Sequence, residues 1–152
     1  MSKAPSPRSR LLITWFIIVI VGLFTICYSW DYGLILPRSM YTNLIALLFL
    51  IIGVLIRIRA LTEIRNAFRI GKLVTSGIYA KTRNPTYLAF TLIIIGISIG
   101  SLAILSFIWV IVSIIAFYYV AKKEERDLEK NFGEDFTKYR ESVPLFIPKL
   151  KN

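Results

Sequence analysis

One stretch of this chain combines basic, polar and helix-starting residues in a pattern that could do chemistry. Residues 73–87 read LVTSGIYAKTRNPTY and lie between two strongly hydrophobic regions. Because the residue before a proline avoids the α region, Asn84 is predicted to be the N-cap of a helix that begins at Pro85. The free N–H groups of this helix start, with Lys81 and Arg83 beside them, favour binding of a carboxylate or phosphate.

A pair of adjacent carboxylates is the second feature with chemical potential. Glu124 and Glu125 are the first acids after residues 85–120, a run of 36 residues without a charged side chain. At a membrane boundary two such carboxylates are costly unless they are solvated, paired or used in function. The alternative to a functional role is a solvated face whose charge is balanced by the neighbouring residues Lys122, Lys123 and Arg126.

The composition indicates an integral membrane protein, which we expect to form one domain over residues 1–152. Hydrophobic residues make up 56% of the chain and the mean hydropathy is +0.65, whereas about 45–50% hydrophobic residues is usual in soluble domains. The net charge of +10 could suggest nucleic acid, but the basic residues lie at the ends of apolar runs, which fits membrane topology and anionic lipid headgroups instead. Cys27 is the single cysteine and there is no histidine, so we expect neither an intrachain disulfide nor a metal site.

The hydrophobic runs predict an all-α, polytopic membrane bundle of about four transmembrane helices. Residues 11–30 and 40–56 are the first two spans, because about 20 apolar residues cross a hydrocarbon core of roughly 30 Å. Residues 85–120 must hold two further helices, and the glycines and serines of residues 96–101 predict the turn between them. The third helix would then have only about 14 residues, which requires either a helix that ends partway through the bilayer or a locally thinned bilayer.

Further helices are predicted outside the spans. Residues 122–133 predict an extension of the fourth helix that stops at Gly133, and residues 134–141 predict a second short helix. An amphipathic helix along the membrane surface is predicted after the second span, from the basic residues Arg57, Arg59, Arg65 and Arg69.

The distribution of lysine and arginine predicts the topology. Of the 19 basic residues, three precede the first span, seven lie between residues 57 and 83, and eight follow Val120, whereas one lies between the first two spans. Cytoplasmic loops carry the excess of basic residues in membrane proteins. Both termini and the loop after the second span are therefore expected on the cytoplasmic side.

Two blocks of the sequence resemble a known family of membrane enzymes. Residues 73–79 and 83–87 (LVTSGIY…RNPTY) are similar to the LVTSGPY…RHPxY block of the isoprenylcysteine carboxyl methyltransferases and their phospholipid methyltransferase relatives. Residues 124–148 are similar to that family's EExxL…FGxxYxxYxxxVPxxIP block. The resemblance covers residues 73–148, which are therefore expected to form the catalytic part.

The resemblance implies methyl transfer from S-adenosylmethionine (SAM), bound between the cytoplasmic ends of the last helices. Carboxylates suit the positive charges and ribose hydroxyls of SAM, whereas arginine suits its carboxylate and tyrosine its adenine or ribose. The residues at motif positions that we expect to bind the cofactor are Tyr79, Arg83, Asn84, Tyr87, Glu124, Glu125 and Tyr139. Those expected to take part in catalysis are Arg83, Asn84, Glu125 and Arg140.

Three positions depart from the family pattern: Asn84 replaces a histidine, Ala89 a glycine and Phe136 a tyrosine. Asparagine cannot carry a proton, and an amine acceptor must lose one before methylation, whereas a carboxylate is already ionised at neutral pH. We therefore expect O-methylation of a prenylated cysteine, or of a similar lipid-linked carboxylate, at the cytoplasmic membrane face. The alternatives are a phospholipid N-methyltransferase and a non-catalytic protein that binds SAM or lipid. The oligomeric state is left open.

Overall fold

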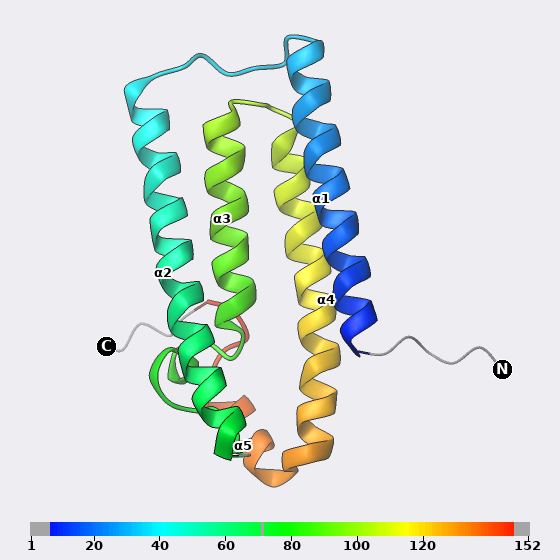
Figure 1. The fold of residues 1–152 in the computed structure, drawn as a ribbon, viewed down its shortest axis with the longest axis vertical. Coiled ribbons are helices and arrows are strands. Elements are labelled where there is room, and N and C mark those ends of the chain that lie inside the picture. Colours follow the sequence, from blue (N-terminus) through cyan, green and yellow to red (C-terminus); the bar gives the residue numbers. More distant parts are fainter. Residues whose placement is uncertain (1–6, 71, 148–152) are drawn as a thin grey trace, which may run out of the picture.

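Four long helices lie side by side and alternate in direction (Figure 1). The computed structural model describes residues 7–70 and 72–147, and its long helices are α1 (Pro7–Asp31), α2 (Met40–Ile70), α3 (Pro85–Ser101) and α4 (Ser106–Phe132). Two short helices, η1 (Gly77–Ala80) and α5 (Glu134–Ser142), lie at the end of the bundle where α2 and α4 finish. No strand occurs in the described part of the chain, and the predicted all-α bundle is confirmed.

The long helices expose large apolar side chains, as membrane helices do. Among the residues that the structure describes, three segments are suited by length and hydropathy to cross a membrane, Leu12–Asp31, Met40–Asn66 and Ser106–Phe132, whereas α3 is apolar but shorter. Leucine and isoleucine side chains of these segments face outward, where lipid tails would surround them. The protein is therefore a polytopic membrane bundle with three helices of spanning length and one shorter apolar helix.

Small residues let α2 and α3 approach each other closely. A Cβ atom at Gly53 would lie 2.9 Å from the carbonyl oxygen of Ala89, and one at Gly96 would lie 2.9 Å from that of Ala46. Both alanines are buried. In lipid, burying apolar side chains gains little, so close packing of this kind is what holds helices together.

The predicted turn at residues 96–101 is wrong, because these residues continue α3 to Ser101 and give it 17 residues. Gly96 faces α2, and the hydroxyl of Ser98 donates to the carbonyl oxygen of Ser106 at 3.2 Å. The small residues therefore serve helix packing, and the chain turns at Leu102, whose φ of 59° is left-handed.

The expected surface helix after the second span is also wrong, since α2 continues without a break to Ile70. Ala60, beyond the predicted end of the span, is fully buried. Glu63 accepts the backbone N–H of Ile78 through both carboxylate oxygens, at 3.1 and 3.0 Å. The charged part of α2 thus continues straight along the bundle, because Ala60 is buried there and Glu63 bonds η1.

The end of α4 agrees with the prediction. The helix runs past its apolar part to Phe132, and Gly133, with a φ of 53°, ends it. The short helix α5 follows at once and buries Phe136 and Tyr139 in a cluster with Val143. This cluster attaches α5 to the end of the bundle.

At the opposite end of the bundle two loops are joined by backbone hydrogen bonds. The N–H of Leu36 donates to the carbonyl oxygen of Leu102 at 2.7 Å, and the N–H of Ile104 donates to that of Leu34 at 3.0 Å. The indole N–H of Trp30 donates to the carbonyl oxygen of Ser101 at 3.0 Å. These bonds fix the α3–α4 turn against the α1–α2 connection.

We expect Ser76 and Ser142 to lie on the same, cytoplasmic side of the membrane, because the start of α1, the loop before α3 and α5 share one end of the bundle (Figure 1). Each serine is changed to cysteine in a Cys27→Ser background and labelled with an impermeant maleimide in intact and inverted vesicles. Tyr32→Cys, at the other end of α1, is the control and should react from the outside only. Labelling of the two serine positions from opposite sides would contradict this topology.

Candidate functional site

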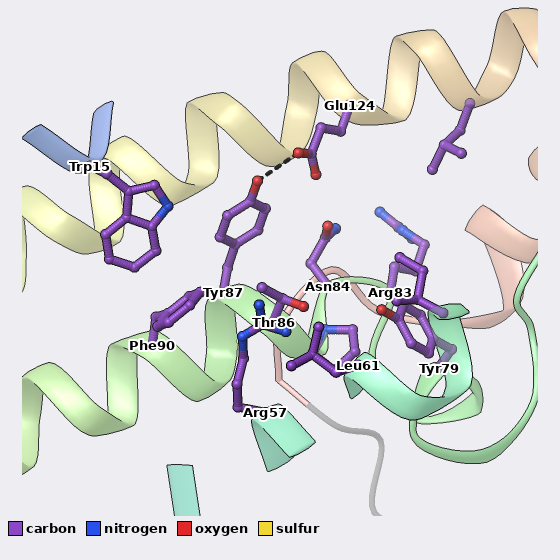
Figure 2. A pocket seen from close by; sticks show the side chains of 13 residues that line it. Trp15, Arg57, Leu61, Tyr79, Arg83, Asn84, Thr86, Tyr87, Phe90 and Glu124 are labelled. Atoms are coloured by element: carbon purple, nitrogen blue, oxygen red, sulfur yellow. Dashed lines mark hydrogen bonds between the residues drawn. The ribbon is translucent and has the colours of Figure 1, made fainter. Parts of the chain in front are cut away.

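A pocket of about 360 Å³ opens at the end of the bundle that carries η1 (Figure 2). Its apolar lining residues are Trp15, Leu61, Ile64, Pro85, Phe90 and Leu128. Its polar lining residues are Arg57, Tyr79, Arg83, Asn84, Thr86, Tyr87 and Glu124. Helices α1, α2, η1, α3 and α4 all contribute, so the pocket exists only when the whole bundle is assembled.

Glu124 reaches the pocket from α4, and Tyr87 holds it there. The Tyr87 hydroxyl donates to Glu124 Oε1 at 2.7 Å (Figure 2). The Tyr87 ring is stacked on Phe117, with ring centroids 5.3 Å apart, and the residue is only 4% exposed. A buried phenol needs a hydrogen-bond partner, and by donating to this carboxylate it fixes the carboxylate's direction.

Glu125, the next residue of α4, has a different partner. Its Oε1 accepts from Arg83 Nε at 2.7 Å and its Oε2 from Lys122 Nζ at 3.1 Å. The side chains of Arg83 and Glu125 are only 9% and 6% exposed. The alternative of a solvated acidic face is therefore wrong for Glu125, which belongs to a buried ion pair.

The segment after α5 crosses the start of α3, and we call residues 143–146 the C-terminal strap. The backbone N–H of Arg83 donates to the carbonyl oxygen of Pro144 at 2.9 Å, and that of Asn84 to Leu145 at 3.2 Å. Arg83 Nη1 donates to the carbonyl oxygen of Val143, the first residue of the strap. The strap thus bonds the two backbone N–H groups that directly precede the first turn of α3.

Asn84 occupies the N-cap position before Pro85, as predicted, but it does not cap the helix. Its side chain makes no hydrogen bond to the first turn, and its φ of −126° and ψ of 62° lie outside the β region usual for an N-cap. Its backbone N–H is already bonded to Leu145. Figure 2 shows the Asn84 amide in the pocket, on the side facing Glu124. The residue is therefore placed to contact a ligand.

Two buried tyrosines, one in the pocket wall and one behind it, are joined by a hydrogen bond. The Tyr139 hydroxyl donates to the carbonyl oxygen of Tyr79 at 2.6 Å and so links α5 to η1. Burial raises the pKa of both phenols above the ordinary value, so both stay protonated at neutral pH. Tyr79 lines the pocket and Tyr139 does not.

The pocket brings together five of the residues expected to form the site: Tyr79, Arg83, Asn84, Tyr87 and Glu124. Three others stand behind this lining. Glu125 pairs with Arg83, Tyr139 bonds η1, and Arg140 Nη1 donates to Glu129 Oε2 at 3.1 Å. In this geometry these three position other groups, and a direct role for them in the reaction stays a prediction.

Sequence reasoning missed the aromatic side of the pocket and Arg57. Trp15 and Phe90 meet edge to face with ring centroids 4.3 Å apart, and the Arg57 guanidinium carbon lies 5.1 Å from the centroid of Phe90. Arg57 opens the basic cluster after the second span, and that signal was visible. Trp15 lies inside an apolar run, where nothing in the sequence distinguished it from a lipid-facing residue.

Two of the departures from the family pattern have a structural explanation. Ala89 is fully buried where α3 meets Gly53 of α2, so a small residue suffices there. Phe136 is 1% exposed within the apolar cluster of α5, and the Arg140 guanidinium lies over its ring at 6.0 Å. No hydroxyl is needed at such a position. Among the described residues no group of His, Cys, Asp and Glu is arranged to hold a metal ion.

Removing the Glu125 carboxylate should destabilise the fold strongly. Glu125→Ala leaves the buried Arg83 guanidinium without its counter-charge, and breaking a buried pair typically costs about 3–5 kcal/mol. The free energy of unfolding is measured by denaturation in mixed micelles. Asp127→Ala, an exposed acid on the same helix, is the matched control and should change little. Equal stability of the two variants would mean that the ion pair contributes nothing.

Removing the Asn84 amide should leave the fold almost unchanged. A working N-cap contributes about 1 kcal/mol, but no capping bond is present here to be lost. Asn84→Ala should therefore cost less than about 0.5 kcal/mol in the same denaturation experiment. Thr42→Ala serves as a control, because Thr42 makes side-chain bonds at the start of α2. A decrease of 1 kcal/mol or more in the free energy of unfolding of Asn84→Ala would show that the amide does cap the helix.

Comparison with known proteins gives the family. A sequence model of the phospholipid methyltransferase family matches residues 41–135, from the start of α2 to the start of α5. No match was found among curated proteins. The matched region contains every lining residue of the pocket except Trp15. The expected family resemblance is therefore confirmed: this chain belongs to the phospholipid methyltransferase family of membrane methyltransferases.

Proposed function

We propose that this chain is a SAM-dependent methyltransferase that acts on a lipid-linked carboxylate, such as that of a prenylated cysteine, at the cytoplasmic membrane face. The observation that carries the proposal is the pocket. It joins Tyr79, Arg83, Asn84 and Tyr87 of the first sequence block to Glu124 of the second, in a chain of a methyltransferase family. Side chains this far apart in sequence meet only through the fold.

The pocket residues fit SAM in size and in chemistry. Pockets for small molecules enclose roughly 300–1,000 Å³, and this one encloses about 360 Å³. The Glu124 carboxylate suits an ammonium or sulfonium charge or a ribose hydroxyl, and the Arg83 guanidinium suits a carboxylate. The ring of Tyr79 offers a flat apolar surface to an adenine.

When bound, SAM supplies a methyl group made electrophilic by the positive charge on its sulfur. The residues of the chain hold the reactants in place. Tyr87 fixes the Glu124 carboxylate, and Glu125 fixes the Arg83 guanidinium. The Trp15 side of the pocket adds an apolar wall. An in-line displacement depends mainly on positioning and electrostatics, so a site of fixed charges and apolar walls is sufficient.

The pocket supports a carboxylate acceptor better than an amine. An ammonium group must transfer a proton to a base before it can accept a methyl group. Among the lining residues the acid is Glu124, which already accepts the Tyr87 hydroxyl, and asparagine stands at position 84 where the family pattern has histidine. A carboxylate needs no such step, because it is ionised at neutral pH.

Phospholipid N-methylation is the second candidate, and two observations favour it. The sequence model that matches this chain is that of the phospholipid methyltransferase family. Glu124 is a carboxylate in a largely apolar site, and such a group can serve as a base. The two candidates differ in the atom that receives the methyl group, which can be measured directly.

The purified protein in nanodiscs is incubated with methyl-labelled SAM and either N-acetyl-S-farnesylcysteine or phosphatidylethanolamine. A methyl ester releases volatile methanol in base, whereas an N-methyl group does not. We expect base-labile label with the farnesylated carboxylate. Base-stable label in the phosphatidylethanolamine arm, without methanol release in the other, would establish the second candidate instead.

Two test variants, one control variant and one binding measurement complete this experiment. Glu124→Gln should weaken SAM binding by roughly ten- to a hundred-fold in calorimetry, whereas the exposed control Asp127→Asn should not. In an active enzyme Asn84→His should change the rate or its pH dependence, because it adds a group that titrates near neutrality. Bound SAM without methyl transfer in either arm, by the native protein or by Asn84→His, would identify a non-catalytic protein.

A further inference from the structure

Arg57 is a cation in the pocket wall that has no role in the proposed reaction so far. It lies in α2, is half-buried, and its guanidinium carbon is 5.1 Å from the centroid of the Phe90 ring. Figure 2 shows it near Thr86, on the wall opposite Glu124. The pocket therefore has a positive group on its α2 side and a negative group on its α4 side.

The other arginines around the pocket have carboxylate partners. Arg83 pairs with Glu125 at 2.7 Å and Arg140 with Glu129 at 3.1 Å. Arg57 makes no ion pair with any side chain that the structure describes. This difference matters because a half-buried charge at a membrane boundary is costly unless it is paired or used.

Acids near Arg57 are engaged with other donors. Both carboxylate oxygens of Glu63, on the same helix, accept the backbone N–H of Ile78. Glu124, across the pocket, accepts the Tyr87 hydroxyl. Arg57 thus remains the positive group of the pocket that has no protein anion, and guanidinium binds carboxylates and phosphates with two parallel hydrogen bonds.

The position of Arg57 favours the acceptor rather than the cofactor as its ligand. Trp15 and Phe90 belong to the pocket and also to an apolar groove of about 430 Å³ lined by α1, α3 and Trp109 of α4. A hydrocarbon chain in this groove would bring its head group to the Phe90 end of the pocket, beside Arg57. Arg83 lies at the other end, beside Tyr79 (Figure 2).

We propose that Arg57 binds the anionic group of the lipid acceptor, a carboxylate or a phosphodiester, and thereby selects anionic acceptors. This assignment rests on the proposed methyl-transfer function, because it places the acceptor in the same pocket as the cofactor. Arg57 is a binding residue here, and it contributes orientation as well as affinity. A neutral lipid of the same shape would leave the guanidinium unpaired.

The test measures acceptor binding in the absence of SAM, by quenching of tryptophan fluorescence in detergent micelles. The carboxylate probe is N-acetyl-S-farnesylcysteine and its neutral match is the corresponding amide. The phosphodiester probe is lysophosphatidylglycerol, which carries one negative charge, and its neutral match is a monoacylglycerol. The variants are Arg57→Met, which keeps the apolar stem, and Arg57→Lys, which keeps the charge. Arg59→Met removes an exposed cation from the same turn of α2, outside the pocket, and is the control.

We expect the native protein to bind at least one anionic probe roughly ten- to a hundred-fold more tightly than its neutral match. Arg57→Met should remove this preference, Arg57→Lys should keep part of it, and Arg59→Met should keep all of it. The arm that loses the preference identifies the anion as carboxylate or phosphodiester. No preference in the native protein, or a preference that survives in Arg57→Met, would overturn the assignment.

A second measurement separates this inference from the proposed function. SAM affinity by calorimetry should be the same in Arg57→Met as in the native protein. A large loss of SAM affinity with unchanged acceptor preference would assign Arg57 to the cofactor and overturn the inference while leaving methyl transfer intact. Failure of the native protein to bind SAM would refute the proposed function, whereas the charge preference for acceptors would stand on its own measurement.

Discussion

The buried ion pair between Arg83 and Glu125 is the interaction on which the rest of the site depends. It ties the start of α3 to α4, and the same guanidinium binds the first carbonyl of the C-terminal strap. Successive residues of a helix point about 100° apart, so fixing Glu125 on Arg83 turns Glu124 toward the pocket and the Tyr87 hydroxyl. One of the two adjacent acids thus holds the helices together, and the other faces the pocket.

The second constraint is the close approach of α2 to α3 at Gly53, Gly96 and Ala89. The two helices remain in contact beyond the apolar part of α2, where Arg57 lies over the Phe90 ring of α3. The charged end of α2 therefore lies beside the start of α3. Arg57 and the Glu63 contact with η1 both follow from this geometry. The polar pocket therefore depends on how small residues pack between α2 and α3, although none of these small residues lines it.

The sequence was sufficient for features that depend on local chemistry and insufficient for those that depend on a neighbour. Pro85 as a helix start and Gly133 as a helix stop are properties of single residues, and both were predicted correctly. Gly96 was misread as a turn, because a glycine that breaks a helix and one that admits another helix look alike in a single sequence. The capping role predicted for Asn84 also failed, because its φ of −126° and ψ of 62° are not those of an N-cap. The strap that bonds its backbone N–H lies about 60 residues further along, and nothing near Asn84 in the sequence indicates this contact.

The charge of the pocket also bears on which reaction it suits. Methyl transfer from a sulfonium to a carboxylate turns a cation and an anion into two neutral products and moves no proton. Opposite charges neutralise each other most readily in apolar surroundings, and Trp15 and Phe90 give the pocket one apolar side. The buried phenols of Tyr79 and Tyr139 stay protonated, and asparagine at position 84 cannot accept a proton. Glu124 is the one acid among the lining residues, so an amine acceptor would have to pass its proton to this carboxylate, whereas a carboxylate acceptor needs no base.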